Sequence, residues 1–169
     1  MKVTNKIGGL AFTIGITMLA SCGERMNQQS YQIMLQGLLK HSVPEISIST
    51  ASHDEHIIFI DAREKNEYKV SHIKNAIWVG YKNFDFKQIH DIDKRKKIVV
   101  YCSIGYRSEK VAEKLIKAGY NNVSNLYGGI FEWVNVGNQV YRLNEPTNEV
   151  HAYNRMWSKW LRKGTKVYN

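Results

Sequence analysis

The chain has 169 residues, of which 43% are hydrophobic and 23% are charged, an ordinary composition for a soluble globular protein. This length accommodates one domain with a proper core and short appendages, and the lack of internal repeats and low-complexity tracts excludes a repeat architecture. The formal net charge is +9, and the surplus is uneven because basic residues but no acidic residue follow Glu149. Such a surplus favours an anionic partner, either a lipid surface or a small substrate.

The N-terminal residues have the pattern of an export signal. Lys2 and Lys6 precede an apolar segment, residues 7–20, that is too short to span a bilayer comfortably. The segment ends in Leu-Ala-Ser-Cys at Cys22, which resembles the lipobox of bacterial lipoproteins. In those proteins the cysteine becomes the first residue, is acylated and tethers the protein to a membrane. A plain cleaved signal or a short anchor, with Cys22 incidental, is the alternative.

The lipoprotein interpretation predicts a bacterial cell-envelope protein on the periplasmic side of a membrane. Gly23 after the cysteine resembles lipoproteins of the outer membrane. Loss of two lysines with the signal lowers the net charge from +9 to +7, and nucleic acid is not an expected partner of an exported protein. With Cys22 acylated, Cys102 has no cysteine left to form an intramolecular disulfide. A lone thiol in an oxidising compartment is either buried and inert or present for its chemistry.

Apolar periodicity predicts alternating helices and strands from residue 31 onward. The first helix is predicted over residues 31–40. Short apolar strands that alternate with helices indicate a mainly parallel sheet covered on both faces, and ligands bind beyond the carboxyl ends of such strands. Cys102 lies at such an end. The predicted strands are 55–61, 76–79, 98–102 and 123–127, and the predicted helices are 64–70, 84–89, 108–118 and 128–133.

The C-terminal residues 146–169 are predicted to form a basic, aromatic helical extension. One interpretation docks this helix on the domain, with its basic side in water. The other places it on a membrane surface, where Trp with Lys and Arg is the expected chemistry and adds to a single lipid anchor. The residues at helical spacing are Tyr153, Met156, Trp157, Trp160 and Leu161.

Cys102 lies where an apolar strand breaks into a tight loop ahead of a helix. Backbone N–H groups at such a junction point inward together and bind negative charge, to which the helix dipole adds. Helix N-termini and a nearby arginine favour the thiolate form of a cysteine. Gly105 allows a backbone turn that a side chain would obstruct, and Arg107 closes the loop with a positive charge. The arrangement suits an anionic sulfur nucleophile.

Four stretches of the chain carry motifs of one family. Residues 61–68 contain an Asp-x-Arg and a Glu-Tyr pair, and residues 72–76 read His-Ile-Lys-Asn-Ala. Residues 102–107 form a Cys-x4-Arg loop, and residues 126–133 read Leu-Tyr-Gly-Gly with a following Trp. Together they resemble the rhodanese-like domain family. Ser71 departs from the glycine that often precedes the histidine there, and we expect only a turn to differ.

The resemblance covers residues 43–140 and implies a doubly wound α/β fold with a five-stranded, mainly parallel central sheet flanked by helices. It also implies that Cys102 forms a persulfide. The expected organisation is a signal peptide (1–21), a lipidated cysteine with its tether (22–30), the rhodanese-like domain (31–145) and the helical extension (146–169).

Loop length separates two chemistries on this fold. Four residues lie between Cys102 and Arg107. Protein phosphatases with a rhodanese-like fold resemble Cys-x5-Arg, with a wider cradle for phosphate, and would need an arginine where Ser108 stands. The smaller cradle suits a sulfane sulfur, so a phosphatase or an arsenate reductase is the less favoured alternative.

The family resemblance implies a sulfurtransferase. Cys102 would take a sulfane sulfur from a small anionic donor such as thiosulfate and pass it to cyanide or to a thiol of a small molecule or protein. No metal or cofactor is expected, since the histidines show no ligand spacing, and we expect a monomer. A non-catalytic persulfide carrier or protein-binding module is the alternative. The loop N–H groups that would stabilise the terminal sulfur belong to Ser103, Ile104, Gly105, Tyr106 and Arg107.

Each supporting residue has two interpretations. Arg107 either binds the anionic donor or pairs with a carboxylate that pins the loop. Asp61 and Arg63 either contact substrate or brace the strand end as a buried ion pair. His72 either acts as a general base or stabilises a turn by a hydrogen bond. Tyr106 is expected at the pocket mouth, and the glycines 128–129 are expected to allow close backbone packing.

Overall fold

The computed structural model describes residues 26–168, and the predicted signal peptide and Cys22 lie outside them. The chain divides into two compact units, Met1–Gln36 and Gly37–Asn169, and the second contains the central sheet. Residues 26–38 are helical, in agreement with the apolar spacing of the sequence there. Within residues 26–168, no helix combines the length and the apolar character needed to cross a membrane.

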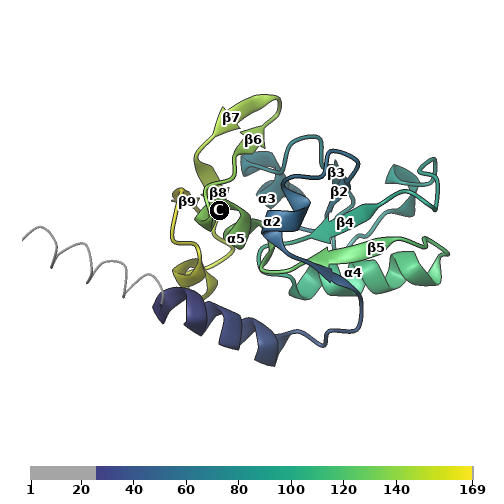
Figure 1. The fold of residues 1–169 in the computed structure, drawn as a ribbon. Helices are drawn as coiled ribbons and strands as arrows, with labels where there is room; N and C mark the ends of the chain where they lie inside the picture. Colours follow the sequence, from purple (N-terminus) through teal and green to yellow (C-terminus); the bar gives the residue numbers. More distant parts are fainter. Residues whose placement is uncertain (1–25, 169) are drawn as a thin grey trace, which may run out of the picture. The chain divides into compact units, whose positions relative to one another are not determined.

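A sheet of five strands forms the centre of the second unit (Figure 1). Every neighbouring pair is parallel, so each strand must be connected to the next by a crossover. This arrangement, with helices in the crossovers, confirms the predicted α/β fold with five central parallel strands. The order across the sheet is β1 (Glu45–Ile46), β5 (Val123–Leu126), β4 (Ile98–Tyr101), β2 (Ile58–Asp61) and β3 (Ile77–Trp78).

Helices cover both faces of the sheet. Side chains alternate along each strand, so successive residues pack against helices on opposite faces. Ile98 and Val100 of β4 belong to a hydrophobic core that includes Val111 of helix α4. Phe59 of β2 instead packs edge-to-face against Trp133 of helix α5, with ring centroids 5.5 Å apart. All four residues of β4 are buried, as expected for a central parallel strand. The helices between the strands are α2 (Ile48–Ala51), α3 (Lys65–Val70), α4 (Tyr106–Lys117) and α5 (Gly129–Asn135).

Two predicted elements are shorter in the structure. The helix predicted over residues 84–89 is a 3₁₀ turn, η1 (Phe86–Gln88), begun by Asp85, whose side chain accepts a hydrogen bond from the N–H of Lys87 at 2.9 Å. The strand predicted from residue 55 begins at Ile58, because the side chain of Asp54 holds the preceding residues in a turn. Strand β1 was not predicted, since two residues are too few to show a periodicity.

Residues 140–168 add two small strand pairs to the second unit (Figure 1). Strands β6 (Val140–Arg142) and β7 (Glu145–Thr147) form an antiparallel hairpin. Strands β8 (Glu149–His151) and β9 (Thr165–Val167) pair in parallel, and β8 packs against α3. The segment after the hairpin is therefore built onto the side of the domain that carries α3.

The predicted C-terminal helical extension is wrong. Between β8 and β9 the chain forms only a 3₁₀ turn, η2 (Trp157–Trp160). Tertiary contacts override the helical spacing: Leu161 is fully buried, and the side-chain oxygen of Asn135 in α5 accepts hydrogen bonds from the N–H groups of Arg162 and Lys163 at 2.7 and 3.3 Å. The structure agrees with docking on the domain, whereas the membrane-surface alternative requires a continuous helix that does not form here.

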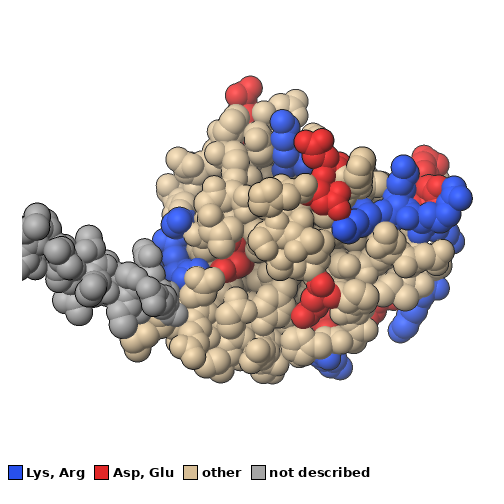
Figure 2. All heavy atoms as spheres, viewed as in Figure 1, with Lys and Arg blue, Asp and Glu red and all other residues tan. Residues whose placement is uncertain are grey.

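Charges on the face drawn in Figure 2 are mixed, because basic side chains lie beside acidic ones without forming one continuous patch. In the described residues, ion pairs join Arg95 to Asp93 at 2.7 Å and Lys97 to Asp54 at 2.8 Å. The positive surplus of the sequence therefore does not gather into a single basic surface on this face.

Candidate active site

Cys102 directly follows β4, at the carboxyl end of the central strand, and is buried, with 1% of its surface exposed. Its Sγ accepts a hydrogen bond from the N–H of Gly105 at 3.2 Å. Gly105 has a φ of +114°, which a residue with a side chain rarely adopts, and helix α4 begins at the next residue. The turn that aims this N–H at the sulfur therefore depends on glycine.

Two carbonyl groups at the start of the loop are held by helix α5. The N–H groups of Ile130 and Phe131 at the start of α5 donate to the carbonyl oxygens of Cys102 and Ser103, at 2.9 and 3.1 Å. In a trans peptide the N–H points opposite to the C=O. The N–H groups of Ser103 and Ile104 therefore point away from α5.

Gly129 allows α5 to approach the loop this closely. A Cβ atom at this position would lie 2.4 Å from the carbonyl oxygen of Cys102 and 2.7 Å from the nitrogen of Ile104. Its φ is +59°, so a side chain would also be strained there. The close backbone packing predicted for the two glycines is present at Gly129.

The end of the loop is fixed by a buried serine. Ser108 Oγ donates to the carbonyl oxygen of Gly105 at 3.0 Å and lies 2.7 Å from Oδ1 of Asn125 in β5. The amide of Asn125 donates to the same carbonyl at 3.1 Å. Because Ser108 is fully buried among these groups, the position does not admit the arginine that a phosphate-sized loop requires.

Arg107 forms a two-pronged ion pair with Glu67 of α3. Its Nη1 and Nη2 donate to the carboxylate of Glu67 at 2.6 and 2.7 Å, and Nη2 also donates to Ser103 Oγ at 3.0 Å. The carboxylate accepts two further hydrogen bonds, from Ser103 Oγ and from the N–H of Glu64, at 3.2 and 3.0 Å. The arrangement ties both ends of the loop to α3.

Burial alone would raise the pKa of the Glu67 carboxyl, but the hydrogen bonds and positive charge of Arg107 outweigh it and lower the pKa to about 2. Burial would likewise lower the pKa of Arg107, whereas its hydrogen bonds to Glu67 and the neighbouring Cys102 and Glu67 charges raise it. Both groups are therefore ionised at neutral pH. Of the two interpretations of Arg107, the geometry supports the carboxylate pair that pins the loop.

Asp61 and Arg63 form a second ion pair, and Asp61 lies at the end of β2. Both side chains are fully buried, and the guanidinium donates to Asp61 at 2.6 Å and to the carbonyl oxygen of Ser71 at 2.6 Å. Burial opposes the charge of Arg63, yet the adjacent Asp61 carboxylate raises its pKa. With these contacts the pair joins the strand end to the turn after α3, which supports the bracing interpretation.

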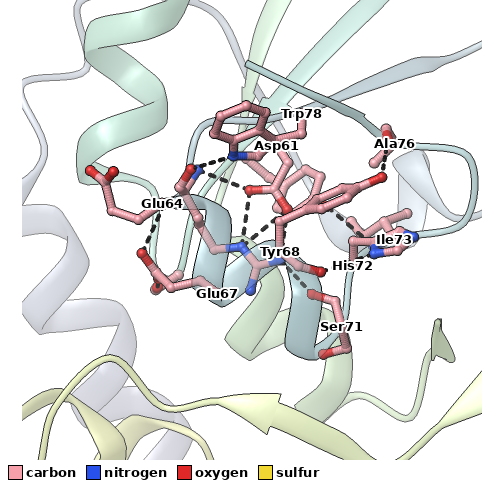
Figure 3. Close-up of polar contacts among 12 residues, drawn as sticks. Asp61, Glu64, Glu67, Tyr68, Ser71, His72, Ile73, Ala76 and Trp78 are labelled. Atoms are coloured by element: carbon pink, nitrogen blue, oxygen red, sulfur yellow. Dashed lines mark hydrogen bonds and ion pairs between the residues drawn. The ribbon is translucent and has the colours of Figure 1, made fainter. Parts of the chain in front are cut away.

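His72 makes structural contacts. Its ring stacks on Tyr68, with centroids 4.1 Å apart, and its Nδ1 lies 3.1 Å from the Tyr68 carbonyl oxygen, which makes Nδ1 the donor (Figure 3). Its backbone pairs with Tyr141 in an isolated β-bridge. The imidazole is buried in this turn and does not line the pocket that holds Cys102. These contacts support the turn-stabilising interpretation rather than a general base.

A pocket of about 460 Å³ opens above Cys102. Tyr106 lines it and is 42% exposed, in agreement with a position at the pocket mouth. Some of the lining residues have no site role predicted from the sequence. Glu67, which contacts the loop without lining the pocket, also has no predicted site role. Glu67 lies in the Glu-Tyr motif quoted above, whereas the spacing of Tyr153 and Trp157 predicted a helix rather than a place in the site. The lining residues are Leu38, Glu64, Tyr81, Lys82, Cys102, Ser103, Ile104, Tyr106, Arg107, Tyr153 and Trp157.

The part of the chain that the structure describes contains no group of three or more His, Cys, Asp or Glu residues arranged to hold a metal ion. Independently of this, the site places the Cys102 thiol against the backbone N–H of Gly105, an arrangement that suits a sulfur nucleophile.

The sequence matches the family model described as "Rhodanese-like domain" over residues 47–136, which is more than half of the chain. The chain therefore belongs to the rhodanese-like domain family, as its four motifs indicate.

Two solved structures illustrate the shared fold. The BH2092 protein from Bacillus halodurans is 27% identical, with a TM-score of 0.54 over 68% of this chain and 85% of that chain. A thiosulfate sulfurtransferase from Pseudomonas aeruginosa is 22% identical, with a TM-score of 0.54 over 70% of this chain and 24% of its own. At this identity the second likeness shows the fold alone.

Among curated proteins, the tRNA uridine(34) hydroxylase of Hamiltonella defensa subsp. Acyrthosiphon pisum is 41% identical over 86 residues. The match covers 48% of this chain and 24% of that protein. A second protein with this name, from Oceanobacillus iheyensis, is matched over 26% of its length. The chain thus spans about a quarter of the length of these curated relatives.

Proposed function

We propose that the protein is a sulfurtransferase that carries a sulfane sulfur on Cys102 as a persulfide. The thiolate of Cys102 attacks the outer sulfur of a small anionic donor such as thiosulfate. The S–S bond of the donor breaks, sulfite leaves with the bonding electron pair, and a terminal anionic sulfur remains attached to Sγ. Membership in the rhodanese-like family supports this class of chemistry, and thiosulfate as donor is part of the proposal.

In the second half of the cycle an acceptor removes the outer sulfur. Cyanide, or the thiolate of a small molecule or protein, attacks the terminal sulfur of the persulfide. The S–S bond on Cys102 breaks, Cys102 leaves as a thiolate, and the product is thiocyanate or an acceptor persulfide. The electrons balance within each step, so neither half requires an external oxidant or reductant.

The observation that carries the proposal is the hydrogen bond from the Gly105 N–H to Cys102 Sγ, in a loop whose first two carbonyl groups are held by α5. Donors fixed in this way stabilise negative charge on sulfur without having to reorganise during the reaction. The ion pair of Arg107 with Glu67 supports the same reading, because it holds the loop in shape. A loop held in this way would suit the negative charge of both the thiolate and the persulfide.

Two other functions are the alternatives, one separated by the same assay and one disfavoured by the loop. A non-catalytic persulfide carrier would gain one sulfur atom without turning over a small acceptor. A phosphatase or arsenate reductase would need the wider loop that the buried Ser108 disfavours. The hydroxylase activity named for the curated relatives is not carried over, since the match covers about a quarter of those proteins.

The test uses the purified protein, incubated with thiosulfate and then with cyanide. We expect the intact mass to increase by one sulfur atom and thiocyanate to form over many turnovers. Cys102→Ser should show neither effect, whereas the matched control Cys22→Ser should show both. Wild-type protein that gains no sulfur and forms no thiocyanate would contradict the proposed function.

The cellular setting is also a proposal. The signal-like sequence before Cys22 supports lipidation of this cysteine and attachment to a bacterial envelope membrane, where the protein would act as a monomer on small donors and acceptors. Nucleic acid is not among the proposed partners. Growth with a clickable fatty acid should label the wild type and Cys102→Ser but not Cys22→Ser. A wild-type protein without label would rule out the lipid anchor.

A further inference from the structure

Two aromatic side chains of the pocket, Tyr153 and Trp157, come from a segment beyond the family match, which ends at residue 136. The ring of Tyr153 covers the guanidinium of Arg107, with 4.9 Å between the Arg107 Cζ and the ring centroid. Trp157 begins the η2 turn, and its backbone N–H donates to Oδ1 of Asn154 at 3.0 Å. The segment between β8 and β9 therefore forms a wall of the pocket that the family motifs do not contain.

The position of Tyr153 is maintained against a backbone preference. Its φ is +65°, in the left-handed region that residues with side chains rarely adopt. Its N–H donates to Nδ1 of His151 at 3.1 Å, and His151 is buried in β8. Strained residues of this kind persist where the surrounding structure determines them, and they cluster at binding sites.

The pocket is larger and more apolar than a small anion needs. Its volume of about 460 Å³ lies within the range of about 300–1,000 Å³ that is usual for sites of small organic molecules. Thiosulfate and cyanide would occupy a small part of it. The charge of Arg107 is already engaged by Glu67 and covered by Tyr153. The apolar and aromatic lining consists of Leu38, Tyr81, Ile104, Tyr106, Tyr153 and Trp157.

We propose that the physiological sulfur acceptor is a small thiol with an aromatic or branched apolar body that lies against Tyr153 and Trp157. The inference rests on the proposed function, because it assigns the substrate class of the second half-reaction. The acceptor thiolate attacks the outer sulfur of the Cys102 persulfide, the S–S bond on Cys102 breaks, and Cys102 leaves as a thiolate. The product is the persulfide of the acceptor, and no further reactant is needed.

The test compares two acceptors that differ only in the body of the molecule, 2-phenylethanethiol and ethanethiol, with thiosulfate as donor. We expect wild-type kcat/KM to favour the phenyl compound by about tenfold or more, the range that a hydrophobic pocket supplies. The ratio should fall toward one in Tyr153→Ala and Trp157→Ala and persist in Tyr153→Phe. Tyr168→Ala is the matched control, since Tyr168 is 46% exposed like Tyr153 but does not line the pocket, and its ratio should equal that of the wild type.

The outcomes separate the two proposals. Thiocyanate formation with cyanide, together with a ratio near one in the wild type, would overturn the acceptor class and leave sulfur transfer intact. A ratio that falls equally in Tyr168→Ala and Tyr153→Ala would also overturn it. Wild-type protein that gains no sulfur and transfers none to cyanide would refute sulfur transfer, and the acceptor class with it.

Discussion

Glu67→Gln removes the carboxylate that accepts two hydrogen bonds from Arg107 and one from Ser103. In the folded protein the pKa of Glu67 is lowered from its ordinary value of 4.5 to about 2. A difference of this size corresponds to about 3 kcal/mol of folding free energy at pH 7, because one pH unit is worth about 1.4 kcal/mol. Removing one partner of a buried ion pair costs about 3–5 kcal/mol in other proteins, which agrees in magnitude.

The pH dependence of this effect has a defined sign. Since the pKa of Glu67 is lower in the folded than in the unfolded state, its stabilisation is fully present above pH 4.5 and is lost as the pH falls toward 2. We therefore expect Glu67→Gln to lower the free energy of unfolding by about 3 kcal/mol at pH 7. The gap between the two proteins should narrow to about 1–1.5 kcal/mol at pH 3.

Urea unfolding of the wild type and Glu67→Gln at pH 7, 5, 4 and 3 measures this gap. The control is Glu145→Gln in the exposed β6–β7 hairpin, which should change the free energy of unfolding by less than about 0.5 kcal/mol at every pH. A gap that stays constant from pH 7 to pH 3, or one below about 0.5 kcal/mol at pH 7, would refute the ion-pair reasoning.

Three further predictions follow from the same geometry. Gly129→Ala should lower the free energy of unfolding by more than about 2 kcal/mol and abolish persulfide formation, because its Cβ would lie 2.4 Å from the carbonyl oxygen of Cys102. Gly137→Ala, also at positive φ but with nothing within 4 Å of its Cβ, should cost only about 1 kcal/mol in a urea titration and keep its activity. Arg107→Lys keeps the positive charge but loses the two-pronged contact with Glu67, so the rate of persulfide formation should fall about tenfold; an unchanged rate would show that charge alone suffices. Asp61→Asn should cost about 3–5 kcal/mol in thermal or urea unfolding by leaving Arg63 unpaired, and a loss below about 1 kcal/mol would argue against the bracing role.

The parts of the fold that were predictable are those with strong local patterns. The apolar run of β4 and the helical spacing that begins near Ser108 locate Cys102 between strand and helix, and both are present. The two-residue strand β1 carries no readable period, so it was missed. The helical spacing from Tyr153 to Leu161 predicted a helix that does not form, because contacts with Asn135 and the pairing of β8 with β9 decide its conformation.

The site shows the same division. Cys102, its short loop to Arg107 and the need for glycine at positions 105 and 129 could be predicted from the sequence, since each depends on neighbouring residues or on backbone conformation.

The choice between two roles for Arg107, Arg63 and His72 could not be made from the sequence, because it depends on which group each side chain reaches. Glu67 lies 40 positions from Arg107 along the chain, and folding alone brings them within 2.6 Å. The aromatic wall of Tyr153 and Trp157 comes from a segment whose pattern predicted another structure.

By itself the sequence determined the α/β fold, the position of Cys102 between a strand and a helix and the size of its loop, because these properties follow from local periodicity and spacing. Only the tertiary structure decided which charges are paired and what surrounds the sulfur, since those contacts join residues that no local pattern relates.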